Sequence, residues 1–520
     1  MSSPASPSII LIGLAAGWPL ALLMRSWQLH YSWALLVLAL LLAARSGLTG
    51  GGWALVAAAA SAGVIGGRWQ HRDTEAGEDL AALASSRLTP VDPLRGPARA
   101  AARALRGDEE ADRWFHGGEL ELGTDERGRV VSVPVGSPGA AGHVLVVGAT
   151  GSGKTVTETW IAVRAIGRGL GAIVVDPKGD RSLREEVGRC ARQARRPFIE
   201  WTPRGPTVYN PYARGSETEI ADKLLAGERF TEPHYLRQSQ RYLGHLLRML
   251  SASGSEVSLQ SIVDHLDPAR LEQLARRVEL SRSEATHCYL DALTARQLSD
   301  LSGVRDRLAI VAESDVGRWL DPRTPGARSF DLLEAVQARA VVYFALEADS
   351  RPLLSEMLGA ALIQDLQTTI AALQGRPTPT LVLIDEYSAL AAEHVVRLFG
   401  RARSAGFSLL LATQELSDLR PPGRERLLEQ ISGNLSALVA HRQVVPASAE
   451  LIAEMSGKMG AWRVSRHGGA SRTRTRTRTR VPVLDAEQIM TLERGWAAVI
   501  RLDGRRETRI ARVHSPGRRS

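Results

Sequence analysis

The apolar residues of the first 67 positions fall into three uncharged stretches, at residues 8–24, 33–44 and 47–67. Crossing a bilayer takes about 20 apolar residues. The first stretch is long enough, and the second would need flanking residues to reach that length. Tryptophans lie in or beside these stretches, as interfacial anchors do: Trp18, Trp27, Trp33, Trp53 and Trp69. The pattern predicts two or three transmembrane helices within residues 1–67, with buried helices of a soluble domain as the alternative. Arg68 and Arg72 favour a cytoplasmic continuation.

A polar segment follows at residues 68–115, with prolines between 90 and 97 and a helical pattern at 98–115. It predicts a membrane-proximal linker that contains one helix. Alternating apolar residues on both sides of residues 124–128 then predict a β-hairpin.

From residue 143 the pattern becomes apolar strand, glycine loop, helix and apolar strand, which indicates a βαβ unit. Between about 215 and 320, apolar residues recur at helical spacing without a convincing strand. Strand patterns return within residues 339–347, 379–390 and 406–415. The sequence therefore predicts one α/β domain from residues 116–214 and 321–515, interrupted by an all-α subdomain at 215–320.

Composition adds a basic C-terminal end to this picture. Hydrophobic and charged contents of 44% and 23% are those of a globular protein. Residues 461–520 hold 15 Arg against 5 acids, and so the whole net charge of +9. Such an end suggests a polyanion nearby, although blocks of like charge are also often solvated tails. Cys190 and Cys288 match no metal-binding spacing, which predicts reduced thiols in a cytosolic domain.

The segment "GATGSGKT" fits the phosphate-binding pattern G-x-x-x-x-G-K-[ST], and it has the strand before it and the helix after it that the pattern requires. Its glycines let successive N–H groups turn toward a β-phosphate. Lys154 would add charge at the β and γ oxygens, and Thr155 would bind Mg²⁺. ATP and Mg²⁺ are the expected ligands. The predicted nucleotide-binding residues are Gly148, Ala149, Thr150, Gly151, Ser152, Gly153, Lys154 and Thr155.

A second motif, "TLVLIDEY", ends a buried strand with Asp385 and Glu386. The carboxyl ends of such strands are where ligands bind in doubly wound sheets. Asp385 is predicted to hold Mg²⁺ and Glu386 to polarise the attacking water, which favours hydrolysis over nucleotide binding alone. The alternative is that the pair only caps the following helix.

The order of these segments resembles the type IV secretion coupling proteins, the TraG/TraD-type ATPases of conjugation, which are relatives of the FtsK/HerA translocases. The resemblance covers roughly residues 115–515 and is carried by "HVLVVGATGSGKT", "VVDPKGD", "YNPY", the helical insertion, "LVLIDE", "GRARSAG" and "LLATQ". It implies a RecA-like P-loop NTPase domain behind N-terminal transmembrane helices. The implied function is a membrane-anchored ATPase that drives DNA transfer through a conjugation channel, multi-pass in the inner membrane with a cytoplasmic ATPase domain.

The resemblance also implies homo-hexameric rings with ATP sites between subunits. Gln414 then matches the polar sensor of the γ-phosphate. Arg403 matches the arginine finger that reaches a neighbour's nucleotide, with Arg401 and Arg442 as competitors. Asp176 either orients Lys154 or water, or belongs to an ordinary strand-to-helix turn.

The implied partners are DNA, the membrane, channel components and a relaxase. No helix-turn-helix or zinc-finger pattern is present, so the expected DNA contact is with phosphates and without sequence specificity. Two alternatives stay open: an FtsK-like pump of double-stranded DNA, and a coupling ATPase for protein effectors.

The stretch "SRTRTRTRTRVP" alternates Arg and Thr from Arg472 to Arg480. In a β-strand this places the arginines on one face and the threonines on the other. It is predicted to be a connecting strand or surface loop, either simply solvated or in contact with DNA or anionic lipid.

Overall fold

The computed structural model describes residues 7–26, 29–43, 50–75, 112–136, 142–227, 232–387, 390, 392–420, 426–466, 474–504 and 507–516. Their contacts form two compact units. The smaller unit contains the N-terminal helices, residues 124–131 and the described part of 450–488. The larger contains the described parts of 110–123, 132–449 and 489–520. Most of the predicted linker at 68–115, with its helix, falls outside the described residues.

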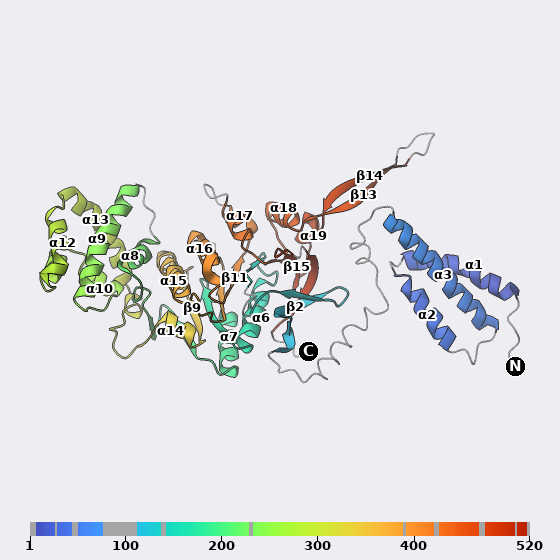
Figure 1. Cartoon of the computed structure of the whole chain (residues 1–520), viewed down its shortest axis with the longest axis horizontal. Coiled ribbons are helices and arrows are strands. Elements are labelled where there is room, and N and C mark those ends of the chain that lie inside the picture. Colours follow the sequence, from blue (N-terminus) through green and yellow to red (C-terminus); the bar gives the residue numbers. More distant parts are fainter. Residues whose placement is uncertain are drawn as a thin grey trace. The chain divides into compact units, whose positions relative to one another are not determined.

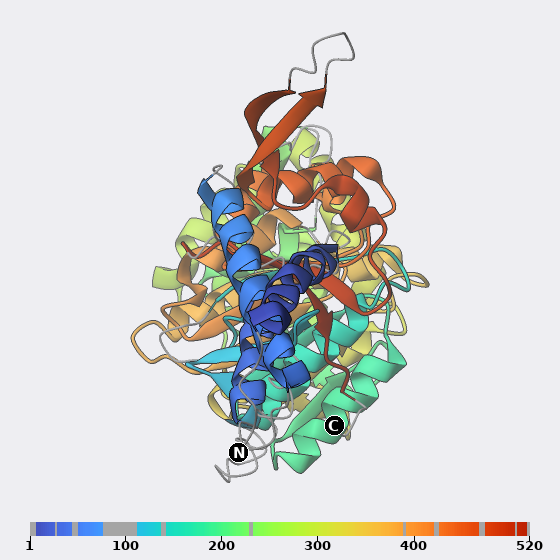
Figure 2. The ribbon, with the colours of Figure 1, turned by 90° about the vertical axis from the view of Figure 1, so that its right-hand side faces the viewer.

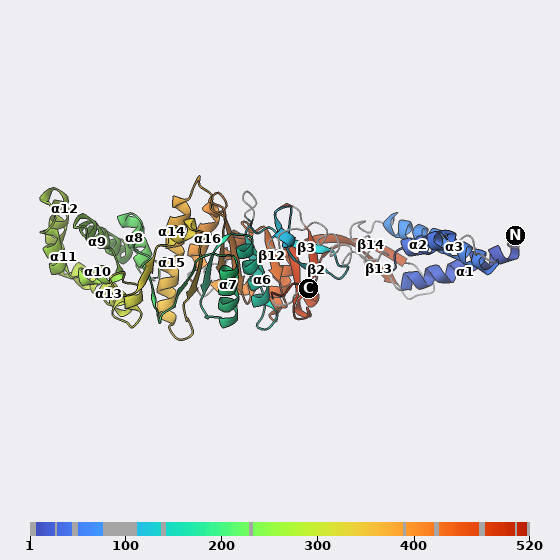
Figure 3. The ribbon, with the colours of Figure 1, turned by 90° about the horizontal axis from the view of Figure 1, so that it is seen from below.

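The N-terminal apolar stretches form helices α1 (Pro7–Ser26), α2 (Ser32–Ala43) and α3 (Gly50–Glu75), which lie along one another (Figure 3). Small residues allow α1 and α3 to approach closely. A Cβ added to Gly17 would lie 1.6 Å from the hydroxyl of Ser61. The same hydroxyl donates a hydrogen bond to the Leu14 carbonyl at 3.1 Å.

The prediction of transmembrane helices is not supported by the described residues, none of whose helices is both long and apolar enough to cross a membrane. Helix α2 has 12 residues, or about 18 Å, against a hydrocarbon core of about 30 Å. Helix α3 reaches 26 residues only by including Arg68, Arg72 and Asp73.

A mixed 12-stranded sheet is formed mainly by strands of the larger unit, as far as the chain is described. Its order is β1-β2-β16-β15-β12-β4-β11-β10-β5-β9-β6, with β3 paired to β2. The strands are β1 (Phe115–His116), β2 (Glu119–Asp125), β3 (Val130–Val133), β4 (Val144–Val147), β5 (Gly171–Asp176), β6 (Phe198–Trp201), β9 (Val341–Ala345), β10 (Thr380–Ile384), β11 (Phe407–Thr413), β12 (Ala437–Ala440), β15 (Trp496–Arg501) and β16 (Thr508–Val513).

The seven strands from β12 to β6 pair in parallel. The inner strands are fully buried and largely apolar, as expected for strands covered on both faces, whereas the edge strand β6 contains Glu200 and is half-buried. Helices α6 (Lys154–Gly167) and α7 (Arg181–Gln193) connect strands that advance toward β6. Helices α15 (Pro352–Ala372) and α16 (Ala392–Ala402) connect strands that advance the other way. Since such crossovers are right-handed, the two pairs of helices cover opposite faces.

A group of helices lies between β6 and β9 in the sequence. In space these helices gather beyond the end of the sheet that β9 and β6 form (Figure 1). They are α8 (Glu217–Leu225), α9 (Pro233–Ala252), α10 (Leu259–Asp264), α11 (Pro268–Ala275), α12 (Leu280–Asp291) and α13 (Ala295–Ala312). Ser216, Ser258 and Thr294 begin three of these helices with capping boxes. The short parallel pair β7 (Thr207–Tyr209) and β8 (Arg328–Phe330) joins the two ends of this insertion, and α14 (Leu332–Gln337) leads back to β9.

The C-terminal part adds α17 (Leu427–Ser432), α18 (Pro446–Met455) and α19 (Ala486–Met490). Asp485 caps α19, accepting a hydrogen bond from the Gln488 N–H at 2.7 Å. Strands β15 and β16 form the final hairpin. The Arg-Thr repeat lies in β14 (Arg474–Pro482), which pairs with β13 (Lys458–Arg466) in a twisted two-stranded ribbon (Figure 2).

Candidate nucleotide-binding site

The glycine-rich loop lies between the end of β4 at Val147 and the start of α6 at Lys154. Gly153 has a φ of 115°, which favours glycine. A Cβ added to Gly148 would lie 2.6 Å from the Ser152 hydroxyl, so this position needs glycine as well. A loop of this kind, followed by a 14-residue helix, directs backbone N–H groups toward an anion.

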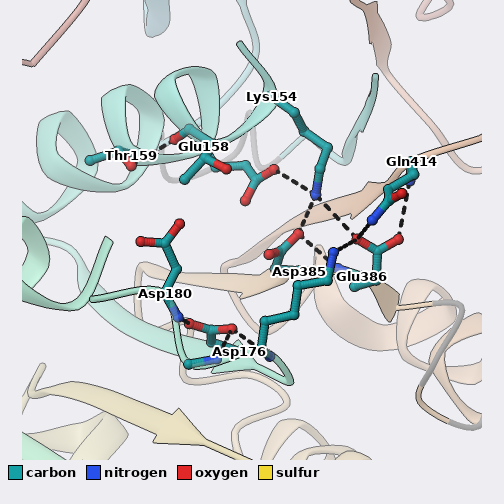
Figure 4. A network of polar contacts seen from close by, with 11 residues as sticks. Lys154, Glu158, Thr159, Asp176, Asp180, Asp385, Glu386 and Gln414 are labelled. Atoms are coloured by element: carbon teal, nitrogen blue, oxygen red, sulfur yellow. Dashed lines mark hydrogen bonds and ion pairs between the residues drawn. The ribbon is translucent and has the colours of Figure 1, made fainter. Parts of the chain in front are cut away.

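The parallel strands bring the predicted site residues together. Strand β11 lies between β4 and β10. The carboxyl ends of parallel strands meet at one edge of the sheet. Gln414 follows β11 at this edge, so it lies between the glycine loop, which follows β4, and the acidic pair, which follows β10. Lys154, Asp385, Glu386 and Gln414 meet there in one polar network (Figure 4).

Lys154 is at the centre of this network, with its side chain 10% exposed. Its Nζ donates to Asp385 Oδ1 and lies 3.3 Å from Glu158 Oε1 and 3.6 Å from Glu386 Oε2. Burial acts to lower the pKa of Lys154, but the charges of Glu158 and Asp385 outweigh it and raise that pKa. The ammonium is therefore charged and surrounded by anions, and a phosphate would have to compete with them.

Glu158 is a member of the cluster that motif analysis missed. It lies one helical turn after Lys154 on α6 and is fully buried, and neither of its oxygens accepts a hydrogen bond from another described residue. Burial, together with the charge of Asp385, raises the pKa of Glu158 to about 8. An acid four residues after the loop lysine, among the apolar residues of "TVTETWIAV", is the signal that could have revealed it.

Glu386 has a strained backbone, with a φ of 41° that non-glycine residues rarely adopt. Its Oε1 accepts from the backbone N–H of Gln414, and its Oε2 from the Gln414 side chain, both at 3.3 Å. Lys178, unassigned by motif analysis although it lies in "DPKGD", donates to the same Oε2 at 2.9 Å. Partial burial acts to raise the pKa of Glu386, but Lys178 and Lys154 together lower it.

Asp176 determines the shape of the turn that carries Lys178. Its carboxylate accepts hydrogen bonds from the backbone N–H groups of Lys178 at 2.9 Å, Gly179 at 2.8 Å and Asp180 at 2.5 Å. The hydroxyl of Tyr343 donates to it as well. Of the two alternatives for Asp176, these contacts favour the strand-to-helix turn.

A cavity of about 460 Å³ opens at this edge and is lined by the glycine loop, Lys178, Asp385, Gln414 and Arg494. Arg494 had no motif signal. Within the described residues, no group of three or more His, Cys, Asp and Glu could hold a metal by itself. Protein Mg²⁺ sites use one or two carboxylates together with substrate phosphates. Thr155 and Asp385 line this cavity and supply such oxygen donors, so the residues fit a magnesium nucleotide.

Arg403 lies at the opposite edge of the sheet, before the start of β11. Its Nη2 donates to the Asn434 carbonyl at 2.9 Å and to the Ser436 hydroxyl at 3.1 Å, just before β12. The structure does not bring it to the Lys154 cluster of its own chain. Arg442 follows β12 at the nucleotide edge, where its carbonyl accepts the Ala149 N–H at 3.0 Å.

A glycine loop between β4 and α6, with an acidic pair two strands away, places the larger unit in the class of P-loop NTPase folds. A family model described as the TraM recognition site of TraD and TraG matches residues 379–494. The chain is also similar to the type 4 coupling protein DotL of Legionella pneumophila, at 22% identity over 351 residues. That match covers 54% of this chain and 45% of DotL, so the chain spans less than half the length of this relative.

Among solved structures the chain is similar to the bacterial conjugative coupling protein TrwBΔN70, with a TM-score of 0.56 and 18% identity, covering 77% of this chain and 96% of that TrwBΔN70 chain. TrwB in complex with ADP and Mg²⁺ gives a TM-score of 0.56 and 18% identity, covering 77% and 94%. The α/β fold with its mixed sheet is thus that of TrwB. The resemblance to the type IV secretion coupling proteins predicted from the sequence is confirmed.

Proposed function

We propose that this chain is an ATPase that couples ATP hydrolysis to DNA transfer through a type IV secretion channel. The observation that carries the proposal is the meeting of Lys154, Asp385, Glu386 and Gln414 beside the glycine loop. The similarity to TrwB, whose structure holds ADP and Mg²⁺, supports a nucleotide in this cavity.

In the proposed reaction each residue acts on the terminal phosphate or on the water. The backbone of the loop and Lys154 hold the phosphates, and Glu386 accepts a proton from a water molecule that Gln414 helps to orient. The water oxygen attacks the terminal phosphorus, and the bond from that phosphorus to the bridging oxygen of ADP breaks. Thr155 and Asp385 would hold Mg²⁺, which supplies positive charge against the charge that develops on the phosphate oxygens.

DNA is the proposed cargo, and the β13–β14 ribbon is the proposed DNA contact in the smaller unit. Residues 455–484 contain eight Lys and Arg and no acid. Directly paired residues of antiparallel strands share a face, and the register pairs Arg474 with Arg466 and Arg478 with Trp462. Basic and aromatic positions thus share one face, a combination that suits phosphates and bases. Arg472 of the repeat lies outside the described residues.

This ribbon can be tested by changing the arginines of the repeat, Arg472 to Arg480, to Gln. The salt dependence of DNA binding should flatten, because fewer counterions are released, while basal ATPase activity persists. Thr475, Thr477 and Thr479 changed to Ser provide a control on the other face. A salt dependence equal to that of the wild type would remove the ribbon from the proposal.

Membrane attachment is also proposed, through the N-terminal helices. Several of their large apolar side chains are exposed, among them Ile12, at 67%, and Leu40, at 62%. An apolar surface of this kind is stable when a bilayer or a partner covers it. Flotation of the full-length protein with vesicles tests this, and a protein that stays in the aqueous fraction would contradict it.

The homo-hexameric ring, the channel components and the relaxase remain proposals from the resemblance, and the description of the 379–494 family model adds a TraM-type partner. A finger role for Arg403 in another subunit would require that a neighbour present its nucleotide to the amino-terminal edge of this sheet. Sedimentation with and without nucleotide tests the ring.

The deciding experiment measures ATP hydrolysis by the full-length protein without DNA, with single-stranded DNA and with duplex DNA, beside Lys154→Ala. We expect DNA to stimulate hydrolysis and Lys154→Ala to abolish it. No activity under any condition overturns the ATPase. Activity that ignores DNA favours a coupling ATPase for proteins, and a response to duplex DNA alone favours an FtsK-like pump.

A further inference from the structure

Lys178 is carried by a backbone that the fold holds in place. It follows β5, which pairs with β10 in parallel, so the turn at 177–180 lies beside the acidic pair. The buried carboxylate of Asp176 accepts the N–H groups of Lys178 and Gly179, and Gly179 has a φ of 76°. Any change in the position of the Lys178 ammonium must therefore come from its side chain.

That side chain can move and is well placed to do so. It is 41% exposed and ends 2.9 Å from Glu386 Oε2. Lysine is a compact charge on a flexible stem, unlike the planar fork of arginine. Lys178 and Gly179 line both the nucleotide cavity and a neighbouring cavity of about 760 Å³. The side chain of Lys178 therefore borders open space in two cavities.

The contact with Lys178 restrains the residue proposed as the base. Glu386 Oε2 also accepts the Gln414 side chain at 3.3 Å, and Oε1 accepts the Gln414 N–H at 3.3 Å. Both oxygens are thus engaged by the protein. These contacts restrict the orientation of the carboxylate and fill the acceptor positions of Oε2, so release of Lys178 frees a position on that oxygen for a water molecule.

The terminal phosphate of a nucleotide is a stronger partner for an ammonium than one carboxylate is. It carries more negative charge and three acceptor oxygens. A nucleotide whose phosphates rest on the glycine loop would bring that group into the cavity that Lys178 lines. The same ammonium would then have two competing anions, Glu386 and the phosphate.

We propose that Lys178 is a switching residue: it pairs with Glu386 until a terminal phosphate enters the cavity, then turns to that phosphate and releases Glu386. The inference rests on the proposed ATPase function and deepens it, because it makes the freedom of the base depend on ATP and not on ADP. Lys178 acts by its position. Loss of the phosphate after hydrolysis returns it to Glu386.

The test compares the affinities of the full-length protein for ADP and for a non-hydrolysable ATP analogue by calorimetry. Lys178→Met should reduce the preference for the analogue about tenfold, because a charge-assisted hydrogen bond to the terminal phosphate is lost. Its affinity for ADP should stay within about twofold of the wild type. Lys178→Arg should restore part of the preference.

Glu386→Gln separates a switch from a simple phosphate contact. Without the competing carboxylate, Lys178 should bind the phosphate more readily, so the preference for the analogue should rise severalfold. In the Lys178→Met background the same change should leave the preference unaltered. Arg181→Met is the matched control: Arg181 lines the same cavity but pairs with Glu185 at 2.8 Å, so both nucleotides should weaken equally.

The inference is overturned if Lys178→Met keeps the wild-type preference for the ATP analogue over ADP. It is also overturned if Glu386→Gln raises that preference in the Lys178→Met background. Failure of the proposed function is distinct, since it would appear as no ATP hydrolysis by the wild type under any condition, or as unimpaired hydrolysis in Lys154→Ala.

Discussion

Two buried lysines of this protein each pair with an aspartate, but the two pairs differ in how fully their hydrogen-bonding groups are satisfied. Lys223, on α8, has a side chain that is 0% exposed. It donates to the carbonyls of Pro211 at 2.9 Å and Arg214 at 2.6 Å, and to Asp365 Oδ1 at 2.7 Å. Tyr209 donates to the other oxygen of Asp365 at 2.8 Å. The three ammonium protons and both carboxylate oxygens of this pair are used.

Among the described residues, the ammonium of Lys154 pairs with carboxylates, and there are more of them than one ammonium can neutralise. Glu158, Asp385 and Glu386 surround it, and Lys178 is the second cation of the group. Three acids thus meet two lysines, and the oxygens of Glu158 accept no hydrogen bond from the described residues. The Lys223 pair is complete and ties the helical insertion to the core, whereas the Lys154 cluster has capacity left for a cation and a phosphate.

The same substitution at the two lysines should separate activity from stability. Lys154→Met should reduce ATP hydrolysis about 10³-fold or more, since the phosphate charge loses its main cation. Its cost in stability should be smaller than that of Lys223→Met, because Glu158, with a pKa raised to about 8, is already largely protonated at neutral pH, and Asp385 lines the open cavity. Steady-state hydrolysis and thermal melting check both points. More than a tenth of wild-type activity would contradict the assignment of Lys154.

Lys223→Met should do the reverse. It leaves Asp365 buried without its cation, which costs about 3–5 kcal/mol of unfolding free energy. Hydrolysis by the remaining folded protein should stay near that of the wild type. Chemical denaturation followed by fluorescence measures the loss. The double variant Lys223→Met/Asp365→Leu should regain most of it, since an apolar pair often replaces a buried ion pair without loss.

The difference between these two clusters explains what the sequence could and could not predict. Lys154 and Asp385 were predictable because backbone geometry dictates their motifs: a glycine loop before a helix, and acids at the end of an apolar strand. Lys223 and Asp365 are 142 residues apart, and nothing local signals their pairing. Glu158 and Lys178 were visible as letters, but their roles depend on which strands become neighbours. Arg403 was assigned from the resemblance as a finger toward a neighbouring subunit; it precedes β11 and so lies at the amino-terminal edge of its own sheet, and its role stays a prediction.

A smaller effect is expected in the pH dependence of stability, because Glu158 is a buried acid in the Lys154 cluster. The pKa of Glu158 is raised from an ordinary value of 4.5 to about 8. Its favourable contribution to stability is thus full below about pH 4.5 and is lost as pH rises through about 8. The slope is at most about 1.4 kcal/mol per pH unit. Glu158→Gln should remove this dependence, so that its advantage in melting temperature over the wild type grows from pH 5 to pH 8. Equal pH dependence of the two proteins would contradict the burial argument.

The smallest effect is expected at Arg403, because its guanidinium is engaged within its own chain and is exposed. Arg403→Gln removes the contacts with Asn434 and Ser436 and should lower the melting temperature by a few degrees, since such exposed contacts contribute about 1 kcal/mol. Hydrolysis should stay within about threefold of the wild type. Arg442→Gln is the comparison at the nucleotide edge. A loss of 100-fold or more in Arg403→Gln alone, recovered by mixing with Lys154→Ala subunits, would instead make Arg403 the finger between subunits.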